Sequence, residues 1–136
     1  MKRALNRSVW RSITLLAALI GVLALLSACG QQDSPVQAVE NYLRLRVASD
    51  APKLLAASCK DWEGQASVEA ASFQSMNAKL DGMACKQSGA DGQFTVVACQ
   101  GQIVTQYAGE TRNWDLAAKN FRVVKEDGQW KMCGYQ

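Results

Sequence analysis

MACKQSGADGQFTVVACQGQIVTQYAGETRNWDLAAKNFRVVKEDGQWKMCGYQ, residues 83–136, is the stretch that decides the fold of this chain. It is rich in Val, Thr, Phe and Trp, and Asp-Gly pairs or a central glycine separate its apolar segments. Such residues favour strands, and such separators favour hairpins over crossover connections. The stretch therefore predicts a four-stranded antiparallel meander. Its strands are expected at residues 83–88, 93–107, 111–125 and 129–136.

Upstream of this stretch, the apolar residues follow a helical period. Ser34 as N-cap and Pro35 at the first helical position are typical of a helix start, and this helix is expected to run to about residue 48. A second, shorter helix is expected at 50–58, and a third from 62 or 65 to 79. Helices followed by a long-stranded antiparallel sheet predict an α+β domain, in which one curved sheet packs on the N-terminal helices.

The N-terminal segment has a basic start, an apolar run and a small-small-cysteine ending. The apolar run at 13–26 is shorter than the roughly 20 residues that a transmembrane helix needs, so cleavage fits better than retention. Its last four residues, LSAC at 26–29, resemble the lipobox of a bacterial lipoprotein. The resemblance implies that residues 1–28 are a cleaved signal peptide and that Cys29 carries a diacylglycerol on its sulfur. The alternative is an ordinary signal in which Cys29 has no role.

Removal of the signal peptide changes the charge of the chain. Four of the fifteen Lys and Arg residues precede Cys29, so 11 basic and 12 acidic side chains remain, a net charge of −1. No basic cluster is left that could neutralise a row of phosphates, so no nucleic-acid partner is expected. The remaining 108 residues suit one domain, with 29–34 as a lipidated tether and 35–136 as the folded part.

A lipid on Cys29 implies an extracytoplasmic protein that is anchored in the cell membrane or the outer membrane. One acyl chain binds a bilayer only marginally, whereas two or three chains give stable attachment. Gly30 stands where an Asp would be the enterobacterial signal for retention in the inner membrane. In a cell with two membranes, this favours the outer membrane.

Four cysteines remain after Cys29, namely Cys59, Cys85, Cys99 and Cys133. An even number in an exported chain indicates disulfides, with three connectivities open. The second and third of them lie on neighbouring expected strands with the same parity, which favours Cys85 with Cys99 and leaves Cys59 with Cys133. A Cys₄ zinc site is the alternative, but zinc ligands usually come in closely spaced pairs, and a redox pair would show a C-x-x-C spacing.

Three segments of the domain carry a family resemblance: VENY at 39–42, ASD at 48–50 and FRVVKEDGQWK at 121–131. Together they resemble small members of the nuclear transport factor 2-like superfamily, which have a cystatin-like cone. The resemblance covers nearly all of 35–136 and implies a cone-shaped pocket between the sheet and the helices. It also implies a homodimer, since relatives commonly dimerise through the exposed face of the sheet.

The chain contains no histidine, which removes Ser-His and Cys-His nucleophile pairs, histidine bases and histidine metal ligands. Ketosteroid isomerase, a relative in the superfamily, combines an Asp base with a Tyr and a protonated Asp. Tyr42 stands on the first helix, where that enzyme also has a Tyr, but no strand Asp matches. We therefore expect no catalytic residue, no metal and no cofactor, and we keep a small cavity isomerase or dehydratase as the alternative.

Aromatic residues are the candidate pocket residues, because they combine large contact area with a polar edge. They are Tyr42, Trp62, Trp114 and Trp130. Packing in the core is the simpler interpretation of each tryptophan. The sequence thus predicts a membrane-anchored, non-catalytic module of the cell envelope that binds an envelope protein or a small apolar ligand.

Overall fold

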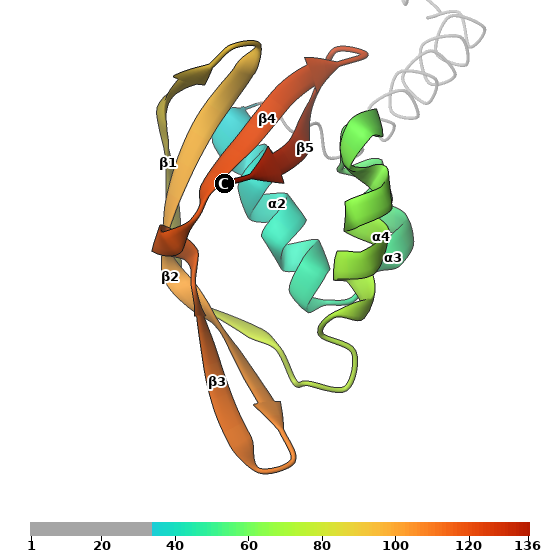
Figure 1. The fold of residues 1–136 in the computed structure, drawn as a ribbon, viewed down its shortest axis with the longest axis vertical. Helices are drawn as coiled ribbons and strands as arrows, with labels where there is room; N and C mark the ends of the chain where they lie inside the picture. The colour runs from blue at the N-terminus through green and yellow to red at the C-terminus, as the bar shows by residue number, and fades with distance from the viewer. Residues whose placement is uncertain (1–33) are drawn as a thin grey trace, which may run out of the picture. The chain divides into compact units, whose positions relative to one another are not determined.

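The computed structural model describes residues 34–136, which form an α+β domain with helices packed on one face of a curved, five-stranded antiparallel sheet (Figure 1). The helices are α2 (Pro35–Val47), α3 (Ala51–Ala56) and α4 (Glu63–Ala71), with the 3-10 turn η2 (Lys60–Trp62) before α4. The strands are β1 (Lys79–Asp91), β2 (Phe94–Tyr107), β3 (Glu110–Asp115), β4 (Asn120–Glu126) and β5 (Gln129–Tyr135), and the 3-10 turn η3 (Leu116–Ala118) precedes β4. The predicted signal peptide and the lipidated Cys29 lie outside the described residues.

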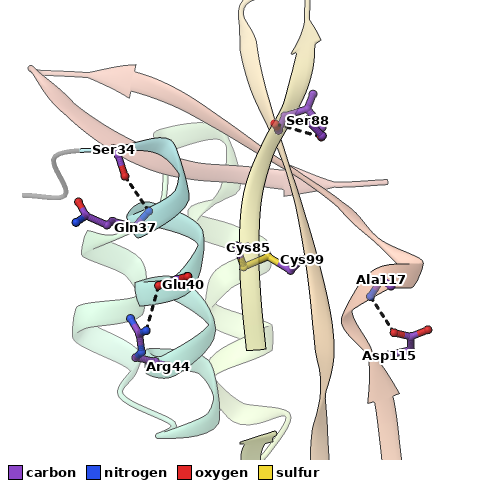
Figure 2. Close-up of a disulfide and its surroundings, with 10 residues drawn as sticks. Ser34, Gln37, Glu40, Arg44, Cys85, Ser88, Cys99, Asp115 and Ala117 are labelled. Atoms are coloured by element: carbon purple, nitrogen blue, oxygen red, sulfur yellow. Dashed lines mark hydrogen bonds and ion pairs between the residues drawn. A yellow bond between two sulfur atoms is a disulfide. The ribbon is translucent and has the colours of Figure 1, made fainter. Parts of the chain in front are cut away.

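Helix α2 begins as its sequence predicts. The Ser34 hydroxyl accepts a hydrogen bond from the Gln37 backbone N–H at 3.2 Å (Figure 2), and Pro35 occupies the first turn. This cap satisfies one of the N–H groups that a helix start leaves free. One face of α2 is buried against the sheet, and its buried residues are Ala38, Val39, Tyr42 and Leu43.

The prediction of a four-stranded meander is wrong, because the expected strand at 111–125 is two strands. Strands β3 and β4 both pair with β2, β4 with its first half at 95–98 and β3 with its second half at 102–107. The chain passes from one to the other through η3, which begins where the Asp115 carboxylate accepts from the Ala117 N–H at 2.9 Å (Figure 2). Leu116, buried at this turn, anchors the crossing in the core.

Two glycines allow the irregularity at which β2 exchanges β4 for β3. Gly101 has a φ of +93° and faces Gly82, φ +61°, in a bulge of β1. A Cβ on Gly101 would lie 2.5 Å from the Gly82 carbonyl carbon, so only glycine permits this approach.

The helix expected to reach residue 79 ends at Ala71, and β1 begins at Lys79 rather than at Met83. Ser75 and Asn77 have positive φ values of 64° and 44°, which no helix contains. Phe73 is nevertheless buried, because the turns after α4 deliver it to the same core. The helical spacing of the apolar residues therefore predicted the burial of Phe73 correctly, but the predicted length of the helix was wrong.

Both favoured disulfides are present, and the four cysteines are therefore not a zinc site. Cys85 and Cys99 are cross-strand partners of β1 and β2 with a Cα–Cα distance of 4.0 Å (Figure 2). Cys59 bonds to Cys133 over a Cα–Cα distance of 5.1 Å and ties the segment after α3 to β5. Within residues 34–136, no helix is both long and apolar enough to cross a membrane.

Candidate functional site

A buried carboxylate lies between the helices and the last strand. Glu69 of α4 is only 2% exposed, and its two oxygens accept hydrogen bonds from two phenols. The Tyr42 hydroxyl of α2 donates to Oε2 at 2.8 Å, and the Tyr135 hydroxyl of β5 donates to Oε1 at 2.7 Å. The carboxylate thus joins three elements that are distant in sequence.

Arg46 and Trp62 complete this cluster, which we call the Glu69 network. Arg46 Nε lies 3.4 Å from Glu69 Oε2 and supplies the opposite charge, while its guanidinium stacks over the Phe73 ring. Trp62 Nε1 donates to the Tyr42 hydroxyl at 3.1 Å. A buried charge is tolerated when it is paired and hydrogen-bonded, and Glu69 meets both conditions.

The network keeps both phenols protonated. Burial raises the pKa of Tyr42 far above its ordinary value, and the negative charge of Glu69 adds to the effect. Burial, followed by the hydrogen bond to Glu69, also raises the pKa of Tyr135. The Tyr42 hydroxyl donates its proton to Glu69 and accepts from Trp62, so protein groups hold it on both sides. This geometry suits a structural cross-brace.

A second site is open to solvent, on the hairpin of β2 and β3. A hollow of about 280 Å³ lies there between the hairpin and the segment after α4. We call it the hairpin hollow. It is lined by Met76, Thr105, Tyr107, Glu110, Arg112 and Trp114.

The strand register explains why these side chains meet. Thr105 is the cross-strand partner of Arg112, and Tyr107 is that of Glu110, so all four lie on one face of the hairpin. Trp114 lies on the same face and contacts the Phe73 ring edge-on, with centroids 6.0 Å apart. Aromatic walls with a charged rim are typical of binding surfaces.

The hairpin hollow and the start of α2 lie at opposite ends of the domain. Figure 1 shows the β2–β3 hairpin projecting past the helices at the end away from the first turn of α2.

The four aromatic residues singled out in the sequence do not share one site. Tyr42 and Trp62 belong to the Glu69 network, and Trp114 lines the hairpin hollow. Trp130 lies on β5, half-buried, with the Lys125 ammonium 5.9 Å from its ring. Tyr42, on the helix where the resemblance implies a cone pocket, is fully buried.

Sequence reasoning missed Glu69, although a signal for it was present. Ala66, Glu69, Ala70 and Phe73 follow one another at helical spacing, which places a carboxylate on the apolar face of the helix. A charge on an apolar face implies a buried partner. Tyr135 and Arg112 carried no comparable signal.

Comparisons with models of protein families, with curated proteins and with solved structures found no match for this chain.

Proposed function

We propose that this chain is a membrane-anchored, extracytoplasmic lipoprotein, held in the cell membrane or the outer membrane through Cys29. The lipobox-like LSAC at 26–29 and the basic and apolar segments before it support this assignment. The two disulfides agree with an oxidising compartment. In the test, Cys29→Ser is expressed in a bacterial host and followed by membrane fractionation. Loss of processing and of membrane attachment is expected, and unchanged attachment would refute the anchor.

We further propose that the domain is a small member of the nuclear transport factor 2-like superfamily. Support comes from the three resembling segments and from the order of helices before a curved antiparallel sheet. The test is a profile built from homologous sequences, which should match the superfamily over residues 35–136.

We propose that the domain acts as a non-catalytic binding module, with the hairpin hollow as its site. One observation carries this proposal. Of the three exposed large hydrophobic side chains among the described residues, Val68, Tyr107 and Trp114, two line the hollow. Side chains of this kind dominate binding surfaces because they exclude much water on contact. The hollow is slightly smaller than the roughly 300 Å³ of the smallest drug-sized pockets, so it suits one apolar side chain of a partner protein or a small apolar molecule.

The proposed lipid anchor would leave this site accessible. Four residues lie between Cys29 and Ser34, and the five Cα–Cα steps of such a tether span at most about 18 Å when it is extended. The first turn of α2 and the β2–β3 hairpin lie at opposite ends of the domain, so attachment before Ser34 leaves the hollow accessible to soluble or opposing envelope components (Figure 1).

The experiment measures binding of labelled pentapeptides to the full chain in detergent micelles by fluorescence anisotropy. A peptide with a central Phe should bind, and its matched peptide with a central Asp should not. Trp114→Ala should weaken binding by about tenfold, which is 1.4 kcal/mol. Val68→Ala removes an apolar side chain elsewhere that is more exposed than Trp114, 65% against 49%, and should leave affinity unchanged. Equal affinities for the two variants would refute the site.

The alternative, a small cavity isomerase or dehydratase, needs a carboxylate that faces Tyr42 across an open cavity. Glu69 is such a carboxylate by position, which is the observation in favour of this alternative. It contacts Tyr42 directly, however, and its second oxygen is taken by Tyr135. Because both oxygens already bond to phenols of the protein, these contacts support the binding module. Turnover of a steroid or other enolisable ketone by the full chain, abolished in Glu69→Gln, would reverse the preference.

A further inference from the structure

The sheet has three edges, and two of them are blunted. Strand β1 carries two register shifts, which interrupt its ladder and discourage pairing with another chain. Strand β5 is covered by the segment after α3, where Ser58 bridges Met132 in parallel and Cys59 N–H donates to the Met132 carbonyl at 2.7 Å. Both edges are therefore poor templates for a further strand.

The outer edge of β3 has neither device. Its six residues form an unbroken ladder with β2, and all six are exposed. Within the part of the chain that the structure describes, no strand pairs with its other side. A regular, exposed edge is a ready template for antiparallel pairing.

The hairpin turn fixes which backbone groups this edge presents. Ala108 and Gly109 both have positive φ, 51° and 82°, as in a two-residue type I′ turn. In such a hairpin, the closing pair Tyr107 and Glu110 is hydrogen-bonded, and the pairs alternate from there. Residues 110, 112 and 114 therefore direct their N–H and C=O groups to β2. Thr111, Asn113 and Asp115 direct theirs outward.

We propose that two copies of this chain dimerise by pairing β3 with β3 in antiparallel orientation, with Asn113 on the two-fold axis. Directly opposite residues must both present their backbone groups, so Thr111, Asn113 and Asp115 have to face one another across the interface. When Asn113 lies opposite the partner's Asn113, Thr111 pairs with the partner's Asp115, and Asp115 pairs with the partner's Thr111. All six outward groups on each copy are then used.

The side chains select the same register. Arg112 stands opposite the partner's Trp114, twice by symmetry, and arginine stacks favourably on a tryptophan face. A shift of the register that places Arg112 on the two-fold axis would set the two Arg112 side chains opposite each other. It would also place Asp115 opposite the partner's hairpin turn, where it has no strand residue to pair with. Like charges directly opposite are destabilising. The proposed register joins the two hairpin hollows along one continuous face.

Covalent capture tests the register, because an interface of six-residue strands is small and its affinity is weak. Hydrogen-bonded antiparallel pairs have Cα atoms about 5.5 Å apart, within the range of a disulfide. The full chain carrying Asn113→Cys should therefore form a covalent dimer on non-reducing gels, above the background of the wild type. Thr111→Cys should not form this dimer, because residue 111 lies opposite the partner's residue 115, four residues along the strand from the partner's residue 111. The double variant Thr111→Cys with Asp115→Cys should restore the dimer.

A proline variant tests the backbone pairing without a cross-link. Asn113→Pro removes an outward N–H and leaves the β2–β3 ladder intact, since residue 113 does not bond to β2. In sedimentation of the detergent-solubilised full chain, it should raise the dimer dissociation constant at least about tenfold. Far-UV circular dichroism and intact native disulfides confirm folding. Equal cross-linking of Asn113→Cys and Thr111→Cys, or unchanged association of Asn113→Pro, overturns the proposal. Neither outcome bears on peptide binding in the hollow.

Discussion

Glu69→Gln tests whether the Glu69 network holds the helices to the sheet. The change keeps the shape of the side chain and removes its charge. Two phenols that donate to a carboxylate at 2.8 and 2.7 Å would then share a neutral amide, of which only the oxygen accepts. The Arg46 guanidinium, whose Nε lies 3.4 Å from the carboxylate, would lose its opposite charge.

The expected cost follows from these three contacts. Hydrogen bonds to charged groups contribute about 1.5–3 kcal/mol and neutral ones about 0.5–1.5, so each phenol loses about 1 kcal/mol. Arg46 adds to this, because its Nε is buried and has no hydrogen-bond partner in the described structure. Removal of one partner of a buried pair costs about 3–5 kcal/mol in other proteins. We therefore expect the free energy of unfolding to fall by about 3 kcal/mol, a large part of the 5–15 kcal/mol typical of a domain.

Urea denaturation of the oxidised chain, followed by tryptophan fluorescence, measures this loss. Glu63→Gln is the matched control, because Glu63 begins the same helix and is exposed. It should cost less than about 1 kcal/mol, the effect of a charge near a helix start. A Glu69→Gln midpoint and slope equal to those of Glu63→Gln would refute the reasoning, since the network would then contribute nothing beyond a surface charge.

Three further outcomes are expected. Above about pH 10, Tyr42 of the unfolded chain releases a proton that the folded chain retains, so the free energy of unfolding falls by up to about 1.4 kcal/mol per pH unit. In urea titrations across that pH range, Tyr42→Phe should make this fall shallower. An unchanged dependence of the free energy of unfolding on pH would contradict the raised pKa. Gly101→Ala should lower the melting temperature strongly, because its Cβ would lie 2.5 Å from the facing backbone. Gly89 has open space around it, so Gly89→Ala should leave the melting temperature nearly unchanged. Calorimetry measures both. Replacement of Cys59 and Cys133 by serine opens a separation of 74 residues and should cost about 4.5 kcal/mol, against about 3 kcal/mol for the cross-strand disulfide with a separation of 14, both measured by urea denaturation. Equal losses for the two disulfides would show that loop entropy does not govern them.

Local patterns predicted much of the fold because their causes are local. Ser34 and Pro35 predicted the start of α2, since a cap acts within one turn. The equal parity of Cys85 and Cys99 on neighbouring strands favoured the disulfide that is observed, because parity decides which face of a strand a side chain occupies. The helix expected to reach residue 79 failed for the opposite reason. Its apolar spacing reflects burial, which turns with positive φ at Ser75 and Asn77 achieve equally well.

The candidate sites were less predictable, because each one is made of residues that only the sheet and helices bring together. Tyr42 and Trp62 were selected as aromatic residues, but the carboxylate to which Tyr42 donates belongs to Glu69, which lies 27 residues further along the chain. Trp114 was selected as well, and its exposure followed from the division of the expected third strand into β3 and β4.

The sequence by itself determined that helices precede an antiparallel sheet, and it determined the favoured disulfide pairing, the lipobox-like segment at 26–29 and the lack of histidine chemistry. These properties depend on residue type and short spacing, which act within a turn or a hairpin. Only the tertiary structure decided that β2 shares its edge between β3 and β4, that each oxygen of Glu69 accepts from a phenol, and that no strand within residues 34–136 pairs with the outer edge of β3. Such features depend on contacts between distant segments, whose geometry is set by the packing of the whole core.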